Sequence, residues 1–120
     1  MAKVMVVDDA VSDVQLMESI LRSAGHQVVV YTDGDALEEK LAAERPDVLF
    51  LDIVMPRRNG YDILRSVKRD ARLRATPVVV VSSKNQPSDR AWGLRQGADE
   101  YVAKPFTSSE LLAAVGRFVG

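Results

Sequence analysis

The sequence predicts a doubly wound α/β domain, in which five parallel β-strands form one sheet and helices cover both of its faces. Short apolar runs rich in valine alternate with longer segments whose apolar residues recur at helical spacing. Five such strand–helix pairs follow one another along the chain, and parallel strands joined by helices place those helices on both faces of the sheet. A length of 120 residues suits one compact domain.

The first half of the chain predicts three strands and two helices. The strand runs are "KVMVV", "QVVVY" and "DVLFL", at residues 3–7, 27–31 and 47–51. Between them, helical spacing recurs first at Val14, Met17, Leu21 and Ala24, and then at Leu37 and Leu41. Gly25 stands where the first helix would end.

The second half predicts three helices and the last two strands. Leu64 and Val67 mark a third helix, and the strand runs "PVVVVS" and "EYVA" follow at residues 77–82 and 100–103. A fourth helix, ending near Gly97, would turn Ala91, Leu94 and Ala98 to the sheet and Trp92 towards solvent. A capping box of Thr107 and Glu110 opens the last helix, whose apolar positions are Leu111, Val115, Phe118 and Val119.

Composition excludes several classes of protein. Sixteen basic and seventeen acidic residues, without a basic block, argue against direct nucleic-acid binding. The absence of cysteine excludes disulfides and thiolate metal sites. No apolar run approaches the length of about 18 residues that spans a bilayer, so we expect a soluble, cytoplasmic protein without membrane insertion.

Polar residues gather where the predicted strands end. In an open parallel sheet, ligands bind beyond the carboxyl ends of the strands, near the point where strand order reverses. The residues at those ends are Asp8 and Asp9, Asp52, Ser82 and Ser83, and Lys104 with Pro105. Turn or helix-start roles are alternatives for single acids. The whole set favours a functional site.

The chemistry of this set favours a magnesium site. Two unit charges about 4 Å apart repel by about 4 kcal/mol at an effective dielectric constant of about 20, so three carboxylates call for a cation. Hard oxygen ligands select Mg²⁺ over zinc or copper, and such an ion keeps open positions for water and a phosphoryl group. His26, the single histidine, lies far from these strand ends and is interpreted as a surface residue.

Taken together, these motifs resemble the receiver domain of bacterial two-component response regulators. The resemblance rests on Asp8-Asp9, on Asp52 before "IVMP", on Gly60, on Ser82 and on "KP" at 104–105, and it covers essentially the whole chain. It implies a flavodoxin-like fold with strand order 2-1-3-4-5, the order that reference examples of this fold family show. It also implies one receiver domain over residues 1–120, without an effector domain.

The resemblance implies a role for each matching residue. Asp52 would accept a phosphoryl group from the phosphohistidine of a sensor kinase or phosphotransfer domain. Asp9, Asp52 and the backbone carbonyl of Val54 would bind Mg²⁺, with Asp8 acting largely through water. Lys104 would pair with phosphoryl oxygens. The protein would be a regulator rather than an enzyme, with at most slow self-dephosphorylation because the apolar Val54 side chain cannot orient water.

Further matches imply a conformational switch. Ser82 would bond a phosphoryl oxygen on activation and Tyr101 would turn inward, although a plain strand aromatic is the alternative for Tyr101. The Lys104–Pro105 bond would be cis. Gly60 is either an ordinary helix-start glycine or a position with an unusual backbone angle. Arg57 and Arg58 are interpreted as a solvated loop.

Other functions remain as alternatives. A flavodoxin would need hydroxyls and amides in its first loop, whereas this loop, "DDAVSD", presents acids. An aspartyl phosphatase would carry two acids one residue apart on one strand, whereas Asp52 is followed by Ile53 and Val54. A phosphorylation-independent pseudo-receiver is the remaining option.

Segment 82–106 is similar to stand-alone regulators of twitching motility, and the rest of the chain is similar to chemotaxis regulators. The expected partners are therefore a kinase and a downstream target protein, with the chain a monomer or a weak activation-dependent dimer.

Overall fold

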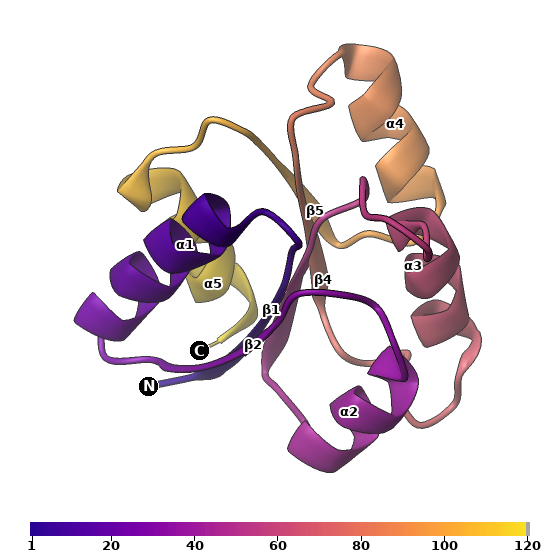
Figure 1. The fold of residues 1–120 in the computed structure, drawn as a ribbon, viewed down its shortest axis with the longest axis horizontal. Helices are drawn as coiled ribbons and strands as arrows, with labels where there is room; N and C mark the ends of the chain where they lie inside the picture. The colour runs from indigo at the N-terminus through magenta and orange to yellow at the C-terminus, as the bar shows by residue number, and fades with distance from the viewer. Residues whose placement is uncertain (120) are drawn as a thin grey trace.

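The protein, described here by a computed structural model over residues 1–119, alternates strands and helices throughout (Figure 1). Its elements are β1 (Lys3–Val7), α1 (Val11–Ser23), β2 (Gln27–Tyr31), α2 (Leu37–Glu44), β3 (Val48–Leu51), α3 (Gly60–Arg69), β4 (Val78–Ser82), α4 (Pro87–Arg95), β5 (Glu100–Ala103) and α5 (Ser108–Phe118). Every predicted strand is present, and two of them begin one residue later than expected. The predicted fold class is confirmed.

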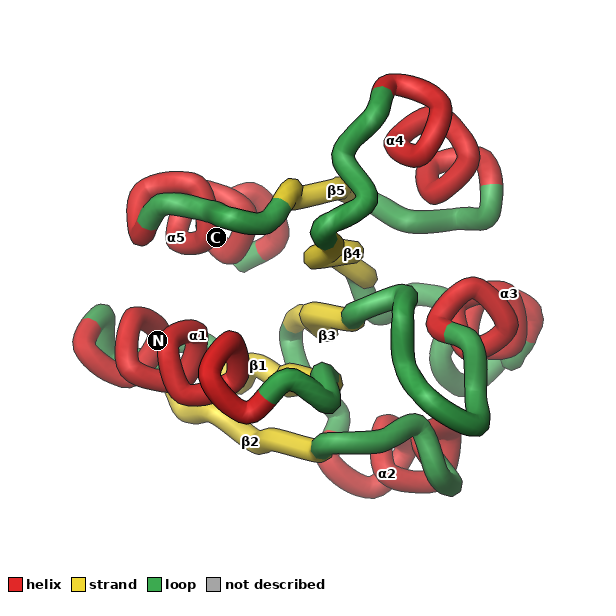
Figure 2. The backbone as a smooth tube through the Cα atoms, turned by 45° about the horizontal axis from the view of Figure 1, so that its top comes forward, coloured by secondary structure: helices red, strands yellow, loops and turns green. Residues whose placement is uncertain are grey.

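The five strands form one parallel sheet in the order β2-β1-β3-β4-β5, which confirms the expected order. Figure 2 shows this sequence of strands across the molecule. The chain moves outward from β1 to the edge strand β2 and then returns to place β3 on the other side of β1. Strand order therefore reverses between β1 and β3, and this is where a parallel sheet presents a binding edge.

Two hydrophobic cores lie on opposite faces of the sheet. Val4 and Val6 of β1 pack with Met17 of α1 and Leu111 of α5, whereas Met5 and Val7 pack with residues of α2 and α3. Figure 1 shows the same division, with α1 and α5 on one side and α2, α3 and α4 on the other. Because both faces are covered, residues 4–7 of β1, the whole of β3 and residues 78–81 of β4 are apolar and buried.

The helix ends follow the sequence signals. Gly25 and Gly97 have φ values of +90° and +113°, just past the ends of α1 and α4, and glycine adopts such values without steric strain. Thr107 and Glu110 form the expected reciprocal capping box of α5. None of the helices among the described residues is long and apolar enough to cross a membrane.

The predicted inner face of α4 was wrong. Ala91 and Leu94 are exposed, Leu94 by 49%, and the buried residue of the helix is Gly93. A Cβ atom on Gly93 would lie 2.9 Å from Cδ2 of Tyr101, so the tyrosine ring occupies the space that an inward leucine would need. Trp92 is 48% exposed, as expected. Ala98 is buried, but it lies beyond the end of α4.

Candidate metal and phosphoryl-acceptor site

Three carboxylates meet at the reversal point of the sheet. Asp8 and Asp9 follow β1, and Asp52 follows the adjacent strand β3. One carboxylate oxygen from each residue lies within 4.8 Å of the others. Asp8 is fully buried and Asp52 is 6% exposed, whereas Asp9 faces solvent. The arrangement is a largely enclosed set of acids with one open side.

Backbone hydrogen bonds fix the two buried acids. The Asp52 N–H donates to the Val7 carbonyl at 2.9 Å, which extends the β1–β3 pairing by one residue. Asp8 Oδ1 accepts from the Ala10 N–H at 2.9 Å, and Asp52 Oδ1 accepts from the Val54 N–H at 3.3 Å. Both side chains therefore project from rigid strand ends into short loops that their own carboxylates help to shape.

Lys104 brings the counter-charge from the far end of the sequence. Its Nζ atom lies 2.8 Å from Asp8 Oδ2, 2.9 Å from Asp13 Oδ2 and 3.7 Å from Asp52 Oδ2. Its backbone N–H donates to the Ser82 carbonyl at 2.8 Å, so β4 helps to place it. The following Lys104–Pro105 bond is cis, as the resemblance implied.

Two adjacent negative charges on Asp8 and Asp52 are electrostatically unfavourable in this buried site. Burial, followed by the charge of Asp8, raises the pKa of Asp52 to about 6, although Lys104 and the Val54 N–H act in the opposite direction. Burial lowers the pKa of Lys104, but its hydrogen bonds to Asp8 and Asp13 outweigh this effect and the net shift is upward. One ammonium thus only partly neutralises the acids.

The side chains fit a hard divalent cation. The cluster offers only carboxylate oxygens, with spacing compatible with a shared ion, and its excess negative charge favours a cation over water alone. Val54, two residues after Asp52, is 54% exposed, so this part of the loop faces solvent. His26 plays no part here, because its Nδ1 accepts from the Ala2 N–H at 3.0 Å, near the start of β1.

Ser82 and Tyr101 lie beyond the acids and are linked to each other through one backbone residue. Ser82 is fully buried, and its Oγ accepts from the Lys84 N–H at 3.1 Å. The Tyr101 hydroxyl donates to the Lys84 carbonyl, and the tyrosine as a whole is 4% exposed. Lys84 therefore connects the serine at the end of β4 with the tyrosine beneath α4. Ser83, by contrast, points to solvent.

Gly60 is required by a close approach of two backbones. A Cβ atom at Gly60 would lie 2.5 Å from both the Asp52 carbonyl oxygen and the Ile53 Cα atom. The Gly60 N–H donates to the Ile53 carbonyl at 2.9 Å. The start of α3 therefore rests directly on the chain that carries Asp52, and this contact, rather than an unusual backbone angle, explains the glycine.

The interpretation of Arg58 as part of a solvated loop was wrong. Its guanidinium donates to the Gly34 carbonyl at 3.0 Å and forms a two-pronged ion pair with Glu38, whose carboxylate also accepts from the Ser66 hydroxyl at 2.5 Å. This Glu38–Arg58–Ser66 network ties the loop after β3 to α2 and α3. No sequence pattern predicts this network, because Glu38 in α2, Arg58 in the loop after β3 and Ser66 in α3 are ordinary surface residue types that lie far apart along the chain.

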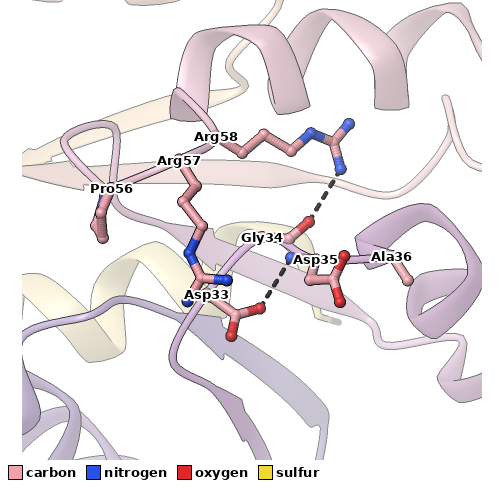
Figure 3. Close-up of a pocket in the computed structure, with 7 residues that line it drawn as sticks. All are labelled: Asp33, Gly34, Asp35, Ala36, Pro56, Arg57 and Arg58. Atoms are coloured by element: carbon pink, nitrogen blue, oxygen red, sulfur yellow. Dashed lines mark hydrogen bonds between the residues drawn. The ribbon is translucent and has the colours of Figure 1, made fainter.

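A pocket of about 350 Å³ lies between the loops that follow β2 and β3. Figure 3 shows Asp33, Gly34, Asp35 and Ala36 on one wall and Pro56, Arg57 and Arg58 on the other. Arg57, with φ +68°, projects towards Asp33, whereas Arg58 reaches the Gly34 carbonyl (Figure 3). The pocket lies at the same edge of the sheet as the acidic site, but it shares none of the three carboxylates.

Asp13 was not among the predicted site residues. It stands in the first turn of α1, where acids commonly complement the helix macrodipole, and that ordinary role hides its contact with Lys104. The fold and the acidic edge together define a doubly wound α/β protein with a carboxylate–lysine site at the reversal of strand order.

The chain matches the response regulator receiver domain over residues 4–116, and it belongs to this family of signalling regulators. It is 37% identical to Protein PilH of Pseudomonas aeruginosa over 115 residues, which cover 96% of this chain and 95% of PilH. These matches confirm the resemblance inferred from the motifs.

Solved structures show the same fold. Chemotaxis protein CheY4 of Vibrio cholerae superimposes with a TM-score of 0.89 at 30% identity, covering 99% of each chain. The receiver domain of sensor histidine kinase PA1611 from Pseudomonas aeruginosa superimposes with a TM-score of 0.90 at 27% identity, covering 99% of this chain and 98% of the other. That receiver domain holds a magnesium ion coordinated in its active-site cleft.

Proposed function

We propose that the protein is a phosphorylation-activated switch whose Asp52 accepts a phosphoryl group from the phosphohistidine of a sensor kinase or phosphotransfer domain. One observation carries the proposal: Asp52 ends a buried strand, with Asp8 and Asp9 within ligand distance and an ammonium 3.7 Å away. Membership of the receiver family supports the same function.

Mg²⁺ is the proposed cofactor. Asp9, Asp52 and the Val54 carbonyl would hold it, and Asp8 would act through water. When bound, the ion would offset the negative charge of the acids and polarise a phosphoryl oxygen. The oxygen-only donor set at the sheet edge supports this assignment, and so does the magnesium in the related PA1611 receiver domain.

In the proposed reaction, a carboxylate oxygen of Asp52 attacks phosphorus and forms an acyl phosphate. The P–N bond of the phosphohistidine breaks, and its electron pair stays on the imidazole nitrogen, which takes a proton from solvent. Lys104 neutralises developing charge on the phosphoryl oxygens. The rigid end of β3 holds the nucleophile in place, which reduces the entropic barrier to the attack.

Activation would then pass through Ser82. If the Ser82 hydroxyl turns to a phosphoryl oxygen, it leaves the Lys84 N–H, and the loop that also holds the Tyr101 hydroxyl must readjust. The resulting movement of the loop before α4 would change a protein-binding surface. The exposed Val54 side chain cannot orient an attacking water, so the acyl phosphate would hydrolyse slowly.

The proposed setting is cytoplasmic motility control, either twitching or chemotaxis, with residues 1–120 acting as a single domain. The similarity to PilH and to a chemotaxis protein supports this setting. The partners would be the kinase and a downstream target protein, without nucleic acid or membrane insertion. The chain would be a monomer, or a weak dimer once phosphorylated.

The test is incubation with acetyl phosphate and Mg²⁺, followed by intact mass measurement. Wild-type protein should gain one phosphoryl group, and the gain should disappear when EDTA replaces Mg²⁺. Asp52→Asn should gain none, whereas Asp47→Asn, which removes the acid before β3, should behave like wild type. A variant Asp52→Asn that is still phosphorylated would contradict the proposal.

A further inference from the structure

Lys104 makes two short contacts with carboxylates, and neither is with Asp52. Its Nζ lies 2.8 Å from Asp8 and 2.9 Å from Asp13, but 3.7 Å from Asp52, which is beyond hydrogen-bond distance. An ammonium has three N–H donors. Two of them are therefore engaged by Asp8 and Asp13, and the ammonium lies beyond hydrogen-bond distance of the residue that would carry the phosphoryl group.

Asp13 differs from the other acids around Lys104. It belongs to α1 rather than to a strand end, and it lies outside the group of three carboxylates that could share a metal ion. Its side chain is 35% exposed, whereas those of Asp8 and Lys104 are 1% and 12% exposed. Asp13 can thus hold Lys104 whether or not a cation occupies the site, and no other role in the proposed reaction falls to it.

The geometry points to Asp13 as a positioning residue that holds Lys104 away from Asp52 and thereby limits how strongly the site retains a phosphoryl group. The inference rests on the proposed function and deepens it. Two bound carboxylates partly offset the positive charge of the ammonium, so it attracts a dianionic phosphoryl group less strongly. The same negative charge on Asp13 favours Mg²⁺, because it offsets the lysine that would otherwise repel the ion.

This role predicts effects of opposite sign on two ligands. Asp13→Asn should raise the dissociation constant for Mg²⁺ alone by about fivefold and lower that of beryllofluoride, a phosphoryl mimic, by about fivefold at saturating Mg²⁺. A merely structural role, such as support of the α1 N-terminus, would weaken binding of both ligands. Tryptophan fluorescence or calorimetric titration measures both constants on the intact protein.

Three further variants make the test specific. Asp13→Glu keeps the charge and should restore values within about twofold of wild type. Asp35→Asn removes an exposed acid near the same sheet edge, in the loop after β2, and should change neither constant by more than about twofold. In a Lys104→Gln background, Asp13→Asn should lose most of its effect on the mimic, because Asp13 acts through the lysine.

Each outcome decides the matter. Opposite changes support the inference when the change in the beryllofluoride constant is lost in the Lys104→Gln background, and a change in that constant that persists there overturns it. Unchanged constants, or two weakened ones, overturn it while leaving the proposed function intact. A wild-type protein that binds Mg²⁺ but not beryllofluoride would overturn the proposed function, and this inference with it.

Discussion

Asp52 combines burial with a neighbouring carboxylate, and both disfavour its charged form. Its pKa of about 6 lies well above the value for an exposed aspartate, and Lys104 reduces the shift without cancelling it. A nucleophile must nevertheless be ionised to attack phosphorus. A divalent cation beside Asp8 and Asp9 would lower that pKa and favour the ionised form of Asp52. The acids that repel one another without metal would therefore, by binding the cation, keep Asp52 ready to react.

Gly60 shows how one atom can decide the geometry of the chain around Asp52 and Ile53. Gly60→Ala should lower the free energy of unfolding by about 3 kcal/mol or more, because its Cβ would meet backbone atoms at 2.5 Å that cannot move aside. Urea denaturation followed by circular dichroism measures the change. This loss is expected even though alanine is the better helix former at most positions.

The matched control is Gly116→Ala, inside α5, where no heavy atom lies within 4 Å of an added Cβ. This variant should gain about 0.5 to 1 kcal/mol from helix propensity. If both substitutions shift stability in the same direction, the close contact between α3 and the Asp52 backbone is not the reason for Gly60.

At the scale of elements, Glu38 links α2 to the loop that follows Asp52. Its hydrogen bond from Arg58, together with that from Ser66, lowers the pKa of Glu38 from 4.5 to about 2, despite an opposing effect of burial. A carboxylate with a lowered pKa in the folded state stabilises the protein above its unfolded pKa. That stability is lost as pH falls through the folded value.

Glu38→Gln should therefore lower the free energy of unfolding at pH 7 by about 1 to 2 kcal/mol, after allowance for partial solvent screening. The difference from wild type should shrink between pH 4.5 and about 2, where wild-type Glu38 becomes protonated. Urea titrations across this range provide the measurement. Glu18→Gln, which removes an exposed pair with Arg22, should cost at most about 0.5 kcal/mol. A pH-independent deficit in Glu38→Gln would exclude the ion pair as its cause.

Trp92 reports on α4 because it lies beside the residue that contacts Tyr101. Its ring meets Tyr61 of α3 edge-on, with centroids 6.5 Å apart, and the adjacent Gly93 rests on the Tyr101 ring. Beryllofluoride with Mg²⁺ should shift Trp92 emission in wild type, because a moving loop before α4 disturbs these contacts. Asp52→Asn should show no shift. Unchanged emission at full occupancy of the mimic would leave Trp92 as an ordinary surface aromatic.

Over the whole molecule, the sequence predicted what depends on strands and their ends. Valine runs buried on both faces marked the sheet, and strand ends placed Asp8, Asp9, Asp52 and Lys104 at one edge. The contact of Asp13 with Lys104 was not predicted, because an acid in the first turn of a helix ordinarily complements the helix macrodipole. The inner face of α4 was predicted wrongly, because the periodicity of apolar residues does not reveal that a glycine is the buried residue.

The most direct measurement is to locate the phosphoryl group. After treatment with acetyl phosphate and Mg²⁺, borohydride reduces an aspartyl phosphate to the corresponding alcohol, which marks the modified residue by mass. Trypsin should place Asp52 in the peptide 41–57 and both Asp8 and Asp9 in the peptide 4–22. We expect the mark in peptide 41–57, with fragmentation assigning it to Asp52 rather than Asp47. A mark in peptide 4–22, or none in a protein whose mass had risen, would contradict Asp52 as the acceptor.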